Sequence, residues 1–437
     1  MPLASLEPLR HRNFALVWWA GLVSNAGSWM QTVAVGAFVT SRTGRAGWAG
    51  LAAAAAFLPI GLLAPIGGAL ADRIDRRRFI MVANLGEAGM ASVLVWLVVS
   101  GRATPASVTA VVFVAGCMGA VRLPFYQAMT PDLVPREQLL AAASLGSAQY
   151  NLGRVVGPTL AGAVIAVWGY QWAFAVNAVS FFAVILAMAL VRIEHVRSTD
   201  TTGLLERIRV GVRAARANPG ARSAIVLIGC VAFLLAPFIA LISARAFDLA
   251  GGEARRLTDP DGVQEATAAI TGYLTTAQGA GAVLGALLLA PLAMRVGRRR
   301  LLLANVTLTP IALAAYAYAP TTPMAVAALA LAGMLYIGIL SGANNVVQLW
   351  APAEFRGRIL SLYLVALGSV YPIGGLIQGS IADRIGLPLT TTIFAAIMFA
   401  VLVFWRLRRP GFLAPLTDPD ELAPSGGIAP VVPRSVR

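Results

Sequence analysis

The 437-residue chain contains no lysine, only two cysteines and two histidines, and only 12% charged residues. Soluble proteins carry about 25% charged residues. Too few charges therefore remain to cover the three soluble domains that the length alone would suggest. Hydrophobic residues make up 58% of the chain, and its mean hydropathy is +0.76. These values predict an integral membrane protein.

The scarce residue types exclude several kinds of site. Cys117 and Cys230 lie in separate apolar segments, and His11 and His195 lie in polar ones. We therefore expect buried free thiols, no disulfide framework, no metal site and no cofactor. Without lysine the chain has no P-loop for ATP. An enzyme or receptor would need a clustered His/Asp/Cys site or a sizeable soluble domain; neither is visible, so we expect no enzyme and no catalytic residues.

Long apolar stretches take the place of charge. A membrane-crossing helix needs about 20 predominantly apolar residues, and the first stretch, opening at Phe14, is too long for a signal peptide. The prediction is an all-α membrane protein with twelve spans, at 13–40, 47–70, 79–100, 105–129, 139–167, 171–192, 222–247, 266–293, 301–319, 322–349, 359–382 and 388–406.

Arginine predicts the orientation of these spans. If the N-terminus is cytoplasmic, 25 of the 34 arginines are cytoplasmic, seven lie on the opposite face, and Arg122 and Arg154 remain inside spans. Such a bias indicates that both termini are cytoplasmic in a multi-pass protein of the cell (inner) membrane. The net charge of +15 is then an asymmetry across a bilayer and implies no nucleic-acid partner.

The longest polar connector divides the spans into two sets of six, and similar motifs recur in both halves. Arginines follow the second and the eighth span, at 76–78 and 298–300. Repeats of the same topology are typical of transporters. We expect an N-terminal six-helix bundle (1–192), a cytoplasmic linker (193–221), a C-terminal six-helix bundle (222–409) and a disordered cytoplasmic tail (410–437). The basic stretch 204–219 predicts either a helix along the membrane interface or a solvated connector.

The connector after the second span reads GGALADRIDRRR, residues 67–78. It resembles the loop motif of the major facilitator superfamily, which in that family acts as a cytoplasmic latch for the outward-facing state. The resemblance assigns Asp72, Arg73 and Arg77 to the latch and Gly68 to a tight helix contact. It implies the major facilitator fold, with two pseudo-symmetric bundles.

Span five contains GRVVGPTLAG, residues 153–162, followed by GYQWAFAVN at 169–177. This run is similar to the antiporter motif of the family's exporters, carried here by Gly153, Gly157, Pro158 and Gly162. A helix rich in Gly and Pro can also be purely structural. Within the superfamily the chain resembles bacterial enterobactin exporters and macrolide efflux pumps. It departs from many relatives at Ser28, where an acid is common, and at Val112, where an arginine is usual.

The resemblance implies a secondary transporter that exports a small amphipathic molecule (a siderophore, a macrolide or another drug-like compound) by proton-coupled antiport, as a monomer in the lipid bilayer. The alternative is an importer or a lysophospholipid flippase on the same scaffold.

Three ionisable residues stand out within the predicted spans and are candidates for coupling: Glu87, Arg122 and Arg154. Glu87 is either a proton carrier or a counter-ion that locks the N-terminal bundle. Arg154, one turn after Tyr150, either meets an anionic or phenolic substrate or makes a structural pair. Polar and aromatic side chains in spans line the substrate pathway or hold helices together; these are Asn25, Ser28, Thr32, Tyr126, Gln127, Tyr150, Tyr336, Asn344, Gln348, Tyr363 and Tyr371.

Overall fold

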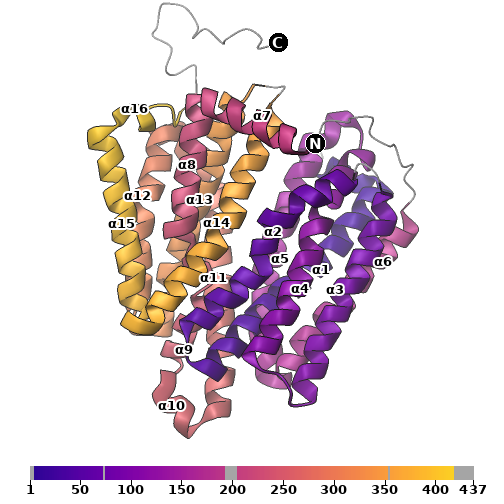
Figure 1. Cartoon of the computed structure of the whole chain (residues 1–437), viewed down its shortest axis with the longest axis vertical. Coiled ribbons are helices and arrows are strands. Elements are labelled where there is room, and N and C mark those ends of the chain that lie inside the picture. Colours follow the sequence, from indigo (N-terminus) through magenta and orange to yellow (C-terminus); the bar gives the residue numbers. More distant parts are fainter. Residues whose placement is uncertain (1–3, 72–73, 192–203, 353–354, 418–437) are drawn as a thin grey trace, which may run out of the picture.

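The computed structural model describes residues 4–71, 74–191, 204–352 and 355–417, and within them every regular element is a helix (Figure 1). The α-helices are α1 (Arg12–Thr43), α2 (Ala46–Ala71), α3 (Arg76–Val99), α4 (Pro105–Met129), α5 (Leu139–Trp168), α6 (Tyr170–Leu190), α7 (Leu204–Ala217), α8 (Pro219–Leu234), α9 (Ile242–Leu249), α10 (Gly252–Thr258), α11 (Pro260–Val296), α12 (Arg298–Tyr318), α13 (Thr322–Trp350), α14 (Arg356–Ile385), α15 (Leu387–Arg408) and α16 (Pro410–Leu413). Short 3₁₀ turns are η1 (Ala4–Arg10), η2 (Thr130–Asp132), η3 (Arg136–Gln138) and η4 (Ala236–Ile239).

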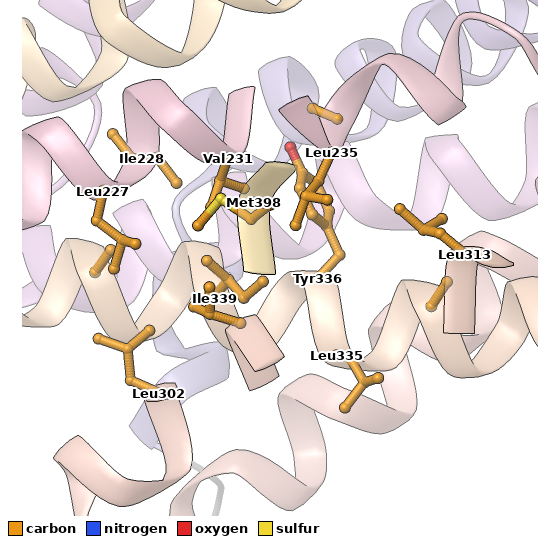
Figure 2. Close-up of a cluster of buried hydrophobic side chains, with 14 of the residues drawn as sticks. Leu227, Ile228, Val231, Leu235, Leu302, Leu313, Leu335, Tyr336, Ile339 and Met398 are labelled. Carbon is orange, nitrogen blue, oxygen red and sulfur yellow. The ribbon is translucent and has the colours of Figure 1, made fainter. Parts of the chain in front are cut away.

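The helices form two bundles, each with its own hydrophobic core. In the C-terminal half, α8, α12, α13 and α15 enclose a cluster that includes Leu227, Leu302, Ile339 and Met398 (Figure 2). In the N-terminal half, one cluster gathers around Phe38 and Phe174 and another around Phe125 and Met188. The clusters around Leu227 and Phe125 each lie within one half, and the cluster around Phe38 takes only Ala268 from the other half.

The membrane spans largely match the expectation. In the described part of the chain, nine helices are long and apolar enough to cross a bilayer: α2, α3, α4, α6 and α11 to α15. The other three predicted spans correspond to α1, α5 and the segment from α8 to α9. Helices α1 and α5 carry more polar residues, including Asn25 in α1 and Gln149 and Arg154 in α5.

The prediction of one continuous helix over 222–247 is wrong. Helix α8 ends at Leu234, η4 follows, and α9 begins only at Ile242. Pro237 lies in this break, and proline has no N–H to donate to a continuing helix. The connector after α9 also forms the short helix α10, and α11 begins at Pro260, before the predicted start at 266.

Helix α7 lies across one end of the molecule, which we call the α7 end, and α16 lies at the same end (Figure 1). It meets α8 at 108°. The bend is at Asn218, whose side-chain oxygen accepts a hydrogen bond from the backbone N–H of Ala221 and caps α8, with Pro219 in the first helical position. We call the opposite end, where α9 and α10 lie, the α9 end.

Candidate functional site

The candidate site is centred on Arg154 of α5, where the two bundles meet. Arg154 Nη2 donates a 2.7 Å hydrogen bond to Oε1 of Gln278 on α11. Arg154 is 8% exposed and Gln278 is fully buried. Because α5 belongs to one bundle and α11 to the other, this contact joins the two halves of the protein deep inside the structure.

Aromatic side chains surround this pair. The Arg154 guanidinium carbon lies 5.4 Å from the centre of the Trp29 ring, and Trp29 packs edge-on against Tyr150 at 5.8 Å. Tyr336 and Tyr371, from the other bundle, lie within electrostatic range of Arg154. Cation–π contacts of this kind stabilise a guanidinium without neutralising it.

Two further ring contacts lie near this group. Phe57 of α2 lies 5.8 Å from Tyr371, and Phe238 of η4 lies 5.8 Å from Tyr336, between ring centres. The Phe57–Tyr371 contact joins the two bundles, whereas Phe238 and Tyr336 both belong to the core of the C-terminal bundle.

Glycines of the antiporter motif bring α1 against α5 and so position Trp29 beside Arg154. A methyl group built on Gly157 would collide with the carbonyl oxygen of Ala26 and lie 2.7 Å from Cβ of Trp29. A methyl on Gly153 would lie 2.8 Å from Cβ of Asn25. Only glycine allows this helix approach.

The same motif faces α11. A methyl on Gly272 of α11 would lie 3.1 Å from the Cα of Gly162 and 3.0 Å from the carbonyl oxygen of Pro158. Pro158 lies inside α5 and has no N–H to donate to the carbonyl of Arg154. Gly162 and Pro158 therefore lie at the contact between the bundles, whereas Gly153 and Gly157 pack against α1 within one bundle.

The bundles are in contact from the α9 end to the middle of the molecule. Asp383 of α14 accepts hydrogen bonds from the backbone N–H of Gly47 at the start of α2 (3.1 and 3.2 Å). Thr40 of α1 and Ser243 of α9 share a hydrogen bond of 3.1 Å. Further along, a methyl on Gly61 of α2 would collide with Ser369 of α14.

Beyond Arg154, toward the α7 end, α5 loses this close partner. A methyl built on Gly146 would have no heavy atom within 4 Å, and Tyr150 is 45% exposed. The bundles are therefore closed at the α9 end and apart at the α7 end, and Arg154 lies where the contact ends.

Glu87 and Arg122 form an ion pair within the N-terminal bundle. Glu87 Oε2 accepts from Arg122 Nε at 2.7 Å, and Oε1 accepts from Nη2 at 3.3 Å. Their side chains are 9% and 22% exposed. The guanidinium also lies 5.4 Å from the ring of Tyr126. Arg154 therefore stands apart from this pair, and of the three predicted coupling residues the structure pairs two.

The predicted pathway residues on α1 have different surroundings. Asn25 Nδ2 donates to Gln149 Oε1 of α5 at 3.4 Å, a contact between helices of one bundle. Thr32 is exposed, and its hydroxyl donates to the carbonyl of Ser28, which is half-buried. Thr32 and Ser28 remain available to a pathway, whereas Asn25 contributes to helix packing.

Outside α1, the predicted pathway residues fall into exposed and buried groups. Gln127 is exposed, and Gln348 is exposed while donating to Asn344 one turn away. Tyr363 is buried and donates to the carbonyl of Leu340 at 2.8 Å. Because its hydroxyl is satisfied within the C-terminal bundle, Tyr363 is not brought to the Arg154 site.

Two of the predicted latch residues, Asp72 and Arg73, lie outside the described residues. Arg77 Nη2 donates to the carbonyl of Ala189 near the end of α6 at 2.8 Å. The tight helix contact expected at Gly68 is absent from the described part of the chain, where a methyl on Gly68 would meet no heavy atom within 4 Å. The close approach is one residue earlier, where a methyl on Gly67 would lie 3.0 Å from the Cα of Val121.

The sequence prediction missed Gln278, Trp29 and Asp383. Gln278 carries a detectable signal, because an amide inside a predicted span is rare. Trp29 reads as an ordinary apolar residue, and Asp383 lies beyond the predicted span end at 382. Their partners are 124 to 336 residues away in the chain, so local patterns contain no information on these contacts.

Among the described residues, no three His, Cys, Asp or Glu side chains gather into a possible metal site.

Comparison with known proteins gives consistent matches over nearly the whole chain. The family model described as "Transmembrane secretion effector" matches residues 3–425. The multidrug efflux pump Tap of Mycolicibacterium fortuitum is 28% identical, over 86% of this chain and 90% of that protein. Macrolide efflux protein A of Streptococcus pyogenes is 27% identical, over 85% of this chain and 90% of that protein.

Among solved structures, a bacterial homologue of the human lysosomal transporter Spinster, in an inward-facing and occupied conformation, has the same fold. It superposes with a TM-score of 0.69 at 15% identity, and the match covers 93% of this chain and 98% of that one.

Proposed function

The chain belongs to the transmembrane secretion effector family of the major facilitator superfamily, and from this premise we propose that it exports small amphipathic molecules from the cell by alternating access. Members of this superfamily are membrane transporters and are not enzymes. Export is supported by the similarity to a multidrug efflux pump and a macrolide efflux protein.

The observation that carries this proposal is the position of the Arg154–Gln278 contact. It lies at the level where the bundles part, beside aromatic side chains from both halves. Binding energy gained from both halves favours states in which the halves enclose the substrate, as alternating access requires.

The arginine bias supports a cytoplasmic α7 end. The structure is then the inward-facing state, in which an exporter takes up its substrate. In this proposal the two bundles, 1–192 and 222–409, rock about the central site. Helix α7, with the exposed residues Arg209, Arg213 and Arg216, lies at the cytoplasmic face of the membrane, where anionic lipid attracts arginine.

We further propose that export is coupled to protons through Glu87. Among the described residues, the remaining carboxylates lie in connectors or near helix ends, whereas Glu87 lies in mid-helix within α3. Protonation of Glu87 would remove the charge that Arg122 contacts at 2.7 Å and so change the packing of α3 against α4.

The first experiment is an accumulation assay in an efflux-deficient bacterium. It uses three fluorescent probes: ethidium (cationic), Nile red (neutral) and fluorescein (anionic). Expression of the protein should lower the accumulation of at least one probe relative to empty vector. Raised accumulation would instead indicate an importer, and unchanged accumulation of all three would count against drug export. The lysophospholipid flippase alternative predicts transbilayer movement of a labelled lysophospholipid in vesicles.

Coupling is tested with the same probe in inverted vesicles under an imposed pH gradient. Glu87→Gln should abolish gradient-driven uptake while retaining binding. Undiminished proton-driven uptake by this variant would exclude Glu87 as the coupling group. Arg45→Gln, at an exposed position of the α9 end, is the matched control for loss of one charge.

A further inference from the structure

Two buried donors at the central site have no acceptor. Arg154 uses Nη2 to reach Gln278, but its Nε has no hydrogen-bond partner. Gln278 accepts through Oε1, but its Nε2 also has no partner. Buried polar groups nearly always find partners, because an unsatisfied donor costs about 1–3 kcal/mol. Both free donors belong to the same contact between α5 and α11.

The charge of Arg154 is also uncompensated. In the described part of the chain, other buried arginines have acids beside them: Arg122 pairs with Glu87 at 2.7 Å, and Arg245 lies 3.9 Å from Asp248. No ion pair among the described residues includes Arg154. A buried charge without a partner is strongly unfavourable, so the site favours any ligand that brings a negative charge to it.

The surroundings define the rest of such a ligand. The guanidinium carbon of Arg154 lies 5.4 Å from the centre of the Trp29 ring, and Tyr150 packs against Trp29. Tyr336 and Tyr371 of the other bundle are close enough for the charge of Arg154 to influence them. Ring faces and edges favour a flat aromatic body. A cationic group, in contrast, would be repelled by Arg154.

We propose that the Arg154–Gln278 pair is a binding site for the carboxylate of an aromatic organic acid. A carboxylate only accepts hydrogen bonds, so its oxygens suit the free Nε of Arg154 and the free Nε2 of Gln278. The inference rests on the proposed function in that it takes the contact between the bundles as the substrate site. It adds that the substrate carries the missing negative charge, and that this charge holds α5 and α11 together when the substrate is bound.

The test is a binding measurement on the full-length protein in nanodiscs of neutral phosphatidylcholine. The probes are 2-naphthoate and 2-naphthamide, which share one aromatic body and differ in charge. We expect the wild type to bind the acid about 10-fold more tightly than the amide or better. Equal affinity for the two probes, including no measurable binding of either, would overturn the inference.

Variants assign the preference to the pair. Arg154→Gln should abolish the preference for the acid and leave amide binding within about twofold, and Gln278→Leu should weaken acid binding several-fold. Arg45→Gln removes one positive charge at an exposed position and should change nothing. A full preference retained in both Arg154→Gln and Gln278→Leu would overturn the assignment. If Arg154→Gln does not fold, as judged by its melting curve, Gln278→Leu decides the same question.

The accumulation assay separates this inference from the proposed function. Export of ethidium together with equal binding of the two naphthyl probes would refute the carboxylate site and leave export standing. A strong preference for naphthoate that depends on Arg154, with no export of any dye, would support the site and count against drug export.

Discussion

The carboxylate of Asp383, near the end of α14, caps the start of α2 across the contact between the bundles. Its two oxygens lie 3.1 and 3.2 Å from the backbone nitrogen of Gly47. The first N–H groups of a helix lack partners within the helix, and the helix dipole favours an anion beside them. This cap exists only while the α9 end is closed, because its two members belong to different halves.

Removal of the cap should therefore favour opening of the α9 end. Loss of a helix cap costs about 0.5–2 kcal/mol, which corresponds to a shift of about 2- to 30-fold in the ratio of closed to open states. The measurement is double electron–electron resonance between spin labels at Arg45→Cys and Leu389→Cys, both exposed positions. In Asp383→Ala the fraction of molecules with a long distance between the labels should be larger than in the same labelled protein with Asp383. The background is Cys117→Ser/Cys230→Ser.

Asp383→Asn is the matched control, because an amide oxygen still accepts a hydrogen bond but has no charge. We expect its distance distribution to lie between those of the wild type and Asp383→Ala. Identical distributions for all three proteins would show that the cap does not influence the conformational equilibrium.

Glycines of α5 should differ sharply in their tolerance of a methyl group. Gly157→Ala would collide with the backbone of α1, whereas Gly146→Ala would have no heavy atom within 4 Å. Overpacking typically costs about 1–3 kcal/mol, while Gly→Ala in an open helix position gains up to about 1 kcal/mol. Melting followed by tryptophan fluorescence should show a lower Tm for Gly157→Ala and an unchanged or higher Tm for Gly146→Ala. The reverse order would contradict the tight α1–α5 contact.

The sequence predicts the helical architecture because hydropathy acts locally. Spans α2, α3, α4 and α6 begin and end close to the predicted bounds. The break after Leu234 shows where prediction from local hydropathy fails. Residues 222–247 have the length and composition of a span, and a proline such as Pro237 does not by itself indicate a break, because many membrane helices contain proline. Here α9 packs against α1 and α11, and η4 packs against α14, a tertiary effect that no window of sequence contains.

The site is predicted only in part, for a related reason. Arg154 and Glu87 are conspicuous as charges in apolar segments, and the sequence identifies both. Their roles depend on distant partners: Glu87 finds Arg122 on the neighbouring helix, whereas Arg154 finds an uncharged Gln278 in the other half. Whether a buried charge is neutralised depends on which residues lie beside it in the folded structure, and the sequence alone does not contain this information.

The Glu87–Arg122 pair should show strong coupling in a double-mutant cycle. Loss of one partner leaves a buried charge and costs about 3–5 kcal/mol, so Glu87→Gln and Arg122→Gln should each lower the stability of the purified protein. The double variant should be less destabilised than the sum of the two, because no unpaired charge remains. Additive effects in chemical denaturation would show that the two side chains do not interact.

The orientation of the protein can be tested with single cysteines in the Cys117→Ser/Cys230→Ser background. Arg213 on α7 and Arg45 between α1 and α2 are exposed at opposite ends of the molecule. The arginine bias predicts that a membrane-impermeant maleimide labels Arg45→Cys in intact spheroplasts, and labels Arg213→Cys only after the membrane is permeabilised. Val179→Cys, on an outward face in the middle of α6, should stay unlabelled in both conditions because the surrounding lipid excludes the polar reagent. Labelling of Arg213→Cys in intact spheroplasts, with Arg45→Cys protected, would show that the α7 end faces outward. The structure would then be an outward-facing state.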